Sequence, residues 1–308
     1  MKILYKKANG IKMFLTSIVL CFSLGVAMAQ PALMWQKTYG GSDNDVVPII
    51  WQTADSGYIM AGSSVSADQQ VSGHHGPAGG YNNDIWVVKT DNSGTLQWEN
   101  SFGGAGNEAA YYVQQTTDGG YIVVGVTDTA NGDVTNWHTG HIGSLRTTDF
   151  WVVKLFPNGT IEWEKSFGGS KNDWATAAQQ TADGGYIIAG FTNSTDGDAT
   201  GGGYHSDPFQ PNANDYWVVK ISAGGAIQWQ HCYGGKYEER PYSIHQTSQD
   251  RGYIVAGEAK GAADGDVGAN YGNSDVWAIK IDSNGTLQWE KNYGGTGYDR
   301  ANFVRHTA

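Results

Sequence analysis

The chain repeats itself, and this internal repetition limits the possible folds more than any other feature of the sequence. A segment that runs from Asp through Trp to Lys occurs four times, at 84–89, 149–154, 215–220 and 275–280. The tryptophans of these segments are 65, 66 and 60 positions apart. Two further motifs recur with them: a Trp followed five positions later by Gly-Gly, and Gly-Tyr-Ile followed by another Gly. The chain is therefore an array of units of about 60 residues.

Each unit has the pattern of four short strands. Two of the links between strands are tight and rich in turn residues, as in Asp-Gly-Gly at 118–120 and Asn-Gly at 158–159. Such residues accept the backbone angles of hairpin turns. Apolar runs such as 151–153 are typical of strands covered on both faces. We therefore predict an all-β protein, a β-propeller-like array of four-stranded antiparallel blades, with a β-solenoid as the alternative.

The repeats also divide the chain. Residues 1–29 precede the array, and residues 30–308 form one repeat domain. Within it we expect a lone strand at 33–41, four full units at about 42–104, 105–169, 170–235 and 236–295, and a partial fifth unit at 296–308. Because the last residues match the strand at 50–54, we expect the chain to be a fragment, or a prematurely terminated product, of a longer protein. Such a product would leave an unpaired strand edge.

Residues 1–29 have the pattern of a secretory signal peptide. Four lysines precede or border an apolar stretch at 13–26, and Ala-Met-Ala at 27–29 supplies a cleavage site. The apolar stretch is short for a membrane span, so we expect a secreted or cell-surface protein and not an integral membrane protein. After cleavage Cys232 is the only cysteine, which excludes an internal disulfide and a zinc site built on several cysteines.

The charge balance of the chain is acidic. The formal net charge is −11, and loss of four lysines with the signal peptide leaves 15 basic and 30 acidic residues, or −15. Nucleic acids and anionic membrane surfaces bind basic patches, so neither is an expected partner. The balance suits a soluble extracellular protein or one that binds cations.

Long inserts follow the second strand of each unit, at 63–83, 126–148, 191–214 and 258–274. We expect them to share one face with the Gly-Gly loops, and function usually lies on long loops held by a rigid scaffold. Runs such as Asp-Gly-Asp in these inserts can present oxygen ligands to Ca²⁺. Asx turns that order an acidic loop are the alternative interpretation. The candidate metal ligands are Asp133, Asp196, Asp198, Asp264 and Asp266.

Three other groups of residues have a structural interpretation. Nine of the 12 tryptophans occupy two repeated strand positions and are expected in the core. The four repeated lysines predict structural ion pairs or solvated strand ends, because catalytic machinery is normally a single constellation. The histidines of three inserts are expected as exposed polar residues rather than metal ligands, since the acid and His spacing of zinc sites is absent. They are His74, His75, His138, His141 and His205.

Aromatic residues in the inserts are the candidate ligand-binding residues. On a polar loop face they could stack on sugar rings, or they could anchor the loops by packing on the blade below, and both interpretations stay open. The residues are Trp137, Tyr81, Tyr204, Phe209 and Tyr271.

No catalytic constellation stands out. The G-x-S-x-G, H-E-x-x-H and P-loop patterns are absent. We therefore predict a non-enzymatic protein that binds a glycan, a protein or a surface through its inserts. A glycan-active hydrolase or its accessory module is one alternative, because two catalytic carboxylates need no fixed sequence spacing. A purely structural array is the other.

The segments at 35–42, 149–154 and 181–190 carry a resemblance. In combination they resemble repeat proteins secreted by Bacteroidetes-type bacteria, which often end in a type IX secretion sorting domain. The resemblance implies a secreted or surface propeller, and no sorting domain is present in this sequence. The pattern at 91–98, repeated at 282–289, is also similar to quinoprotein-type propeller repeats, which we interpret as shared blade geometry.

Overall fold

The computed structural model describes residues 33–76, 82–138, 140–142, 145–205, 209–210 and 212–305. The chain divides into two parts, Met1–Met34 and Trp35–Ala308, and every described strand belongs to the second. Within the described residues the only helical element is a single 3₁₀ turn at Gly197–Ala199. None of the described segments forms a helix with the length and apolar character needed to cross a membrane.

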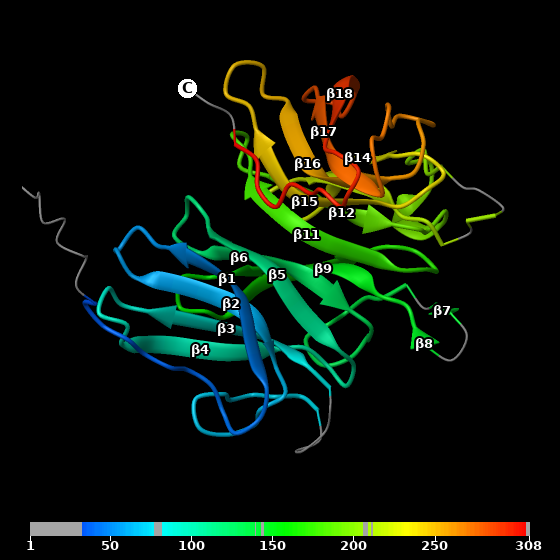
Figure 1. Ribbon diagram of the computed structural model, residues 1–308. Coiled ribbons are helices and arrows are strands. Elements are labelled where there is room, and N and C mark those ends of the chain that lie inside the picture. The colour runs from blue at the N-terminus through cyan, green and yellow to red at the C-terminus, as the bar shows by residue number, and fades with distance from the viewer. Residues whose placement is uncertain are drawn as a thin grey trace, which may run out of the picture. The chain divides into compact units, whose positions relative to one another are not determined.

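The fold consists of four antiparallel sheets of four strands each, which confirms the predicted all-β units (Figure 1). The first sheet contains β1 (Asp45–Gln52), β2 (Tyr58–Ser64), β3 (Asp84–Thr90) and β4 (Leu96–Phe102). The second contains β5 (Glu108–Gln115), β6 (Tyr121–Thr127), β9 (Asp149–Leu155) and β10 (Ile161–Phe167). The third contains β11 (Asp173–Gln180), β12 (Tyr186–Thr192), β13 (Asp215–Ile221) and β14 (Ile227–Tyr233). The fourth contains β15 (Glu239–Gln246), β16 (Tyr253–Lys260), β17 (Ser274–Ile281) and β18 (Leu287–Tyr293).

Two segments differ from the expected pattern. Residues 33–41 are not assigned to a strand, because no described strand pairs with their backbone. The segment is still held in place, since the Trp35 indole N–H donates to the carbonyl of Asn92 at 3.0 Å. The second insert adds a short hairpin that the sequence did not predict, β7 (His141–Ile142) with β8 (Leu145–Arg146).

Of the nine tryptophans predicted in the core, Trp289 is 43% exposed, and the other four at its repeat position are only partly buried. The tryptophans of the third strands form the centre of each sheet, as predicted. Their side chains are at most 1% exposed, and each indole N–H donates to a Glu or Gln on the neighbouring fourth strand. Trp151, for example, donates to Glu164 at 2.9 Å. A buried indole N–H needs a hydrogen-bond acceptor. The Glu and Gln side chains of the fourth strands therefore stabilise the buried tryptophans. These tryptophans are Trp86, Trp151, Trp217 and Trp277.

The repeated lysines form ion pairs, which confirms the structural interpretation. Each lysine is nearly buried, and its ammonium lies 2.7–3.0 Å from an Asp in the hairpin between the first and second strands. The hydrogen bond from Lys89 lowers the pKa of Asp55 to about 2. The pairs are Lys89–Asp55, Lys154–Asp118, Lys220–Asp183 and Lys280–Asp250.

The order of the sheets places their first strands next to one another. The second strand of each sheet packs against the first strand of the following sheet. The first strands also meet in sequence, β1 with β5, β5 with β11, and β11 with β15, as Figure 1 shows. Side chains from four different units therefore reach one shared surface.

Candidate functional site

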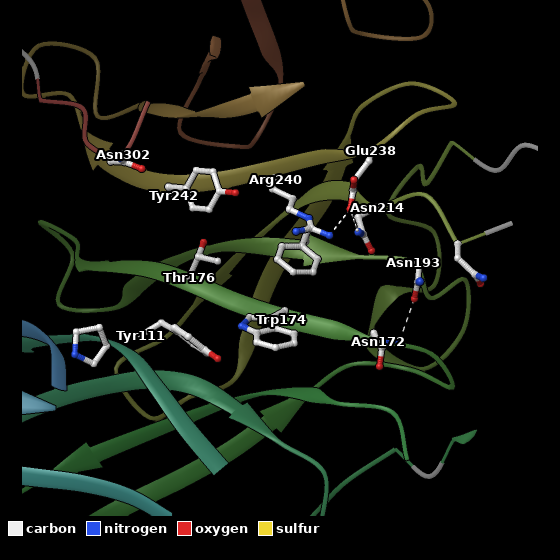
Figure 2. A pocket seen from close by; sticks show the side chains of 13 residues that line it. Tyr111, Asn172, Trp174, Thr176, Asn193, Asn214, Glu238, Arg240, Tyr242 and Asn302 are labelled. Atoms are coloured by element: carbon white, nitrogen blue, oxygen red, sulfur yellow. Dashed lines mark hydrogen bonds and ion pairs between the residues drawn. The ribbon is translucent and has the colours of Figure 1, made fainter. Parts of the chain in front are cut away.

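A cavity of about 840 Å³ lies on the surface shared by the first strands (Figure 2). Trp174 and Thr176 of β11, and Arg240 and Tyr242 of β15, project into it from alternate positions of their strands. Tyr111 of β5 faces them. The other lining residues are Pro48, Asn172, Phe191, Asn193, Asn212, Asn214, Glu238 and Asn302.

Aromatic rings form one wall of the cavity. The antiparallel pairing of β11 with β12 sets Trp174 opposite Phe191, and the two rings stack with centroids 5.9 Å apart and an interplanar angle of 20°. Tyr111 packs against the same indole at 5.5 Å. The guanidinium of Arg240 lies 5.2 Å above the ring of Phe191. These contacts cover part of the Trp174 side chain, and the remainder faces the cavity.

Amides and one carboxylate line the cavity beside these rings (Figure 2). The backbone N–H of Asn172 donates to the side-chain oxygen of Asn193 at 2.9 Å. Glu238 accepts from the Asn214 amide at 3.2 Å and forms ion pairs with Arg240 and Lys260. Burial alone would raise the pKa of Glu238, but the hydrogen bond from Lys260 and the charge of Arg240 hold this pKa below its usual value. Glu238 is therefore an ionised partner of cations and not a proton donor.

The four predicted aromatic residues of the inserts that the structure describes do not line this cavity. The indole N–H of Trp137 donates to the carbonyl of Thr147 at 3.2 Å, and the hydroxyl of Tyr204 donates to the carbonyl of Ala213 at 2.7 Å. Both side chains therefore tie an insert to its own ends. Phe209 and Tyr271 are 89% and 61% exposed. Tyr81 lies outside the described residues.

We expect Tyr204→Ala to lower the melting temperature. The change removes the hydrogen bond to Ala213 and the packing of the ring on the third-sheet core, which together account for about 1–3 kcal/mol. Thermal unfolding followed by circular dichroism measures the effect. Phe209→Ala is the matched control, because that ring is almost fully exposed and its removal should leave the transition in place. Equal melting temperatures for the two variants would contradict the anchoring role.

Histidines of three inserts link successive units. In each case Nδ1 lies 2.8–2.9 Å from a buried Asp at the start of the third strand, and the His backbone N–H donates to the same oxygen. Nε2 lies 3.4–3.9 Å from an Asp in the insert of the next unit. We call these groups junction triads. They are Asp84–His75–Asp133, Asp149–His138–Asp198 and Asp215–His205–Asp266.

The prediction of exposed polar histidines is wrong for His74, whose side chain is 1% exposed, and for the three histidines of the junction triads. The histidine side chains of the triads are only 26–32% exposed, because each insert wraps around the buried Asp of its own unit. The hydrogen bond that its ring donates to Asp149 raises the pKa of His138, and the bond to Asp215 does the same for His205. The fourth insert has Tyr271 at this place, and only its backbone N–H contacts Asp275.

The predicted metal ligands hold the inserts onto the Gly-Gly turns. Asp133, Asp198 and Asp266 each accept from the first glycine N–H of such a turn, at 3.2–3.3 Å. Asp196 accepts from the Ser170 N–H, and Asp264 pairs with Lys236. No group of three or more metal-binding side chains is found among the residues that the structure describes. Binding of Ca²⁺ stays a prediction, and a melting temperature raised by millimolar Ca²⁺ would support it.

Two carboxylates meet above the first glycine of four of the Gly-Gly turns, and all of these acids except Asp299 are buried. A methyl group added at Gly103 would lie 2.5 Å from Glu108 Oε2 and 2.7 Å from Asp84 Oδ1. The second glycine N–H donates to the acid that begins the next strand, for example from Gly104 to Glu108 at 2.9 Å. Glycine is therefore needed here because both carboxylates approach the backbone closely. The equivalent acid pairs are Asp149 with Asp173, Asp215 with Glu239, and Asp275 with Asp299.

Burial shifts the proton affinity of these acids. It raises the pKa of Glu108 to about 7 and that of Glu239 to about 9. One side chain on the neighbouring strand contributes to this difference, in addition to the nearby acids. The hydroxyl of Thr127 donates to Glu108 at 2.8 Å, whereas Glu239 pairs with Ala259 and its second oxygen has no partner among the described residues.

No known protein family and no curated protein matches the chain.

The sequence analysis did not predict the cavity, although the repeat contains a signal that could have revealed it. Each unit has an acid four residues after its Gly-Gly pair, and the residue three positions after this acid differs from unit to unit. The residues at this position are Pro48, Tyr111, Thr176, Tyr242 and Asn302. All five residues line the cavity. A position that varies within an otherwise regular repeat is a candidate for a binding surface, because packing does not constrain it.

Proposed function

We propose that the protein is a non-enzymatic glycan-binding module whose sugar site is the cavity between the first strands. The observation that carries the proposal is the half-buried indole of Trp174, which lines this cavity together with amide side chains. Aromatic faces stack on the apolar faces of sugar rings, and amides exchange hydrogen bonds with hydroxyl groups. The volume of about 840 Å³ lies within the range of small-molecule sites and suits a short oligosaccharide.

We further infer that the four sheets are successive blades of a propeller. One repeat position from each of five successive units lines a single cavity, which is the arrangement expected of strands around a central axis. In a solenoid the same positions would lie in a row. Spin labels at positions 48 and 302 distinguish the two, because only a row would separate them by several strand spacings. Cys232 is buried and should not take up the label.

The hydrolase alternative receives less support from this cavity. Glycosidases act with two carboxyl groups that flank the bond to be cleaved. Of the described residues that line the cavity, Glu238 is the only carboxylic acid, and it is paired with Arg240 and Lys260. The cavity therefore favours binding over turnover.

We expect Trp174→Ala to weaken glycan binding by about tenfold or more, since stacking on an indole contributes over 1 kcal/mol. A glycan array with the full-length protein would identify ligands, and calorimetry at 20 °C would then compare affinities. Trp137→Ala is the matched control, because this indole lies in an insert away from the cavity lining. Absence of any retained glycan would refute the proposal. Turnover of the bound sugar would favour the hydrolase instead.

A further inference from the structure

Arginine is rare in this chain and is concentrated near the cavity. The sequence contains five arginines, and three of them lie on or beside the surface of the first strands. Arg240 lines the cavity, Arg300 lies against the ring of Tyr242, and Arg305 lines the adjoining cavity that shares Tyr111 and Tyr242. Because the chain has 30 acidic and only 19 basic residues, a cluster of arginines at this surface indicates a specific role for positive charge.

The guanidinium of Arg240 is only partly used by the protein. One Nη donates to Glu238, and Nε is buried with no hydrogen-bond partner among the described residues. An unpaired buried donor costs free energy, so an acceptor brought by a ligand would be stabilising. The ring of Phe191 below holds the guanidinium plane in place. Arg240 is therefore positioned for a planar anionic group.

The charges around Arg240 do not cancel. Glu238 is shared between Arg240 and Lys260, so one carboxylate faces two cations. Arg300 adds a third cation, with its guanidinium 5.5 Å from the Tyr242 ring. Glu258 is the second acid near this wall and accepts from the Tyr242 hydroxyl at 3.0 Å. Among these side chains, three cations face two acids in a protein that is negative overall.

We propose that the cavity selects acidic sugars, with Arg240 binding a carboxylate or sulfate of a ring that stacks on Trp174. This inference rests on the proposed function and names the ligand class of the same site. Arginine presents two parallel N–H donors to such groups and so recognises their geometry as well as their charge. Arg240 and Trp174 occupy the same position of two successive repeat units, one residue after the acid that begins the strand. A neutral sugar would use the stacking wall and leave the cation unpaired.

Calorimetry with the full-length protein and matched oligosaccharides tests the inference. Oligogalacturonate is compared with its methyl ester, and a sulfated oligogalactan with its desulfated form. We expect the acidic member of at least one pair to bind about tenfold more tightly at low salt, with the preference reduced at high salt. The pair that shows the preference distinguishes a carboxylate ligand from a sulfate ligand.

Variants assign the preference to Arg240. We expect Arg240→Gln to abolish it and Arg240→Lys, which keeps the charge without the paired donors, to retain part of it. Arg251→Gln is the matched control, because this arginine lies in a hairpin turn away from the cavity. Equal binding of acidic and neutral members, or a preference that survives in Arg240→Gln, would overturn the inference and leave glycan binding intact. Failure of every oligosaccharide to bind would overturn the proposed function as well.

Discussion

Gly125→Ala should destabilise the protein by about 3 kcal/mol or more and lower its melting temperature by roughly 10 °C. A methyl group at this position would lie 1.8 Å from the backbone carbonyl oxygen of Ala109. The pairing of β5 with β6 shifts register between Ala110 and Tyr112, and this bulge brings the β5 backbone against the glycine. β5 is the edge strand of its sheet, but it is paired with β6 and packs against β2 and β11, so its backbone cannot move aside without loss of ladder hydrogen bonds and packing. Thermal unfolding and the soluble yield measure the effect.

Gly224→Ala is the control for this prediction. A methyl group there would have no atom within 4 Å, so we expect a change within about 0.5 kcal/mol. The close approach recurs in every sheet, at Gly62, Gly190 and Gly257, with carbonyl distances of 1.8, 2.2 and 2.0 Å. A melting temperature for Gly125→Ala equal to that of the control would show that the bulge is not rigid.

The free energy of unfolding should fall by several kcal/mol as the pH rises from 5 to 9. Burial raises the pKa of Glu108 and Asp173 to about 7 and that of Glu239 to about 9. In the unfolded chain these acids titrate near pH 4. The folded state therefore binds more protons. The contribution of these three acids to stability is fully present below pH 4 and is lost as the pH rises through their folded pKa values. Each tenfold difference in proton affinity between the two states corresponds to about 1.4 kcal/mol.

Two histidines of the junction triads change the free energy of unfolding in the same direction, and Asp55 does not change it between pH 5 and 9. His138 and His205 have raised pKa values, so their contribution is also lost as the pH rises above neutrality. Asp55 has a pKa of about 2, and its stabilising effect is lost only in stronger acid. Around Glu239 the facing charges are Asp215, Glu238 and Asp266, all acidic, and they add to the effect of burial.

Two variants of the fourth sheet test the origin of this pH dependence. Glu239→Gln keeps an acceptor for the Gly235 N–H and removes the charge, so the fall in stability between pH 5 and 9 should be smaller. Ala259→Thr supplies the hydroxyl that Thr127 and Thr192 provide in the two preceding sheets, and should stabilise the protein at pH 8.5. Urea unfolding at pH 5.5, 7 and 8.5 measures both. A flat profile in the unmodified protein would contradict the assignment of buried, protonated acids.

The sequence alone was sufficient for the local architecture. Hairpin turns such as 118–120, the apolar run at 151–153 and the repeated Lys154 depend on residues close in the chain, or on one contact repeated in every unit. Because each pattern occurs in four copies, each copy supports the prediction made from the others. For this reason the four-stranded units, the central tryptophans and the lysine ion pairs were predicted correctly.

Only the tertiary structure decided which of the remaining side chains act together. His138 binds one Asp of its own unit and one of the next, and the sequence does not show which acids a loop will wrap around. The cavity joins Tyr111, Trp174 and Arg240 from three units, at positions where the repeat is irregular. The pattern that reveals a repeated fold comes from residues shared by every unit. The cavity, in contrast, is built from residues in which the units differ, so its composition emerges only when the first strands lie side by side.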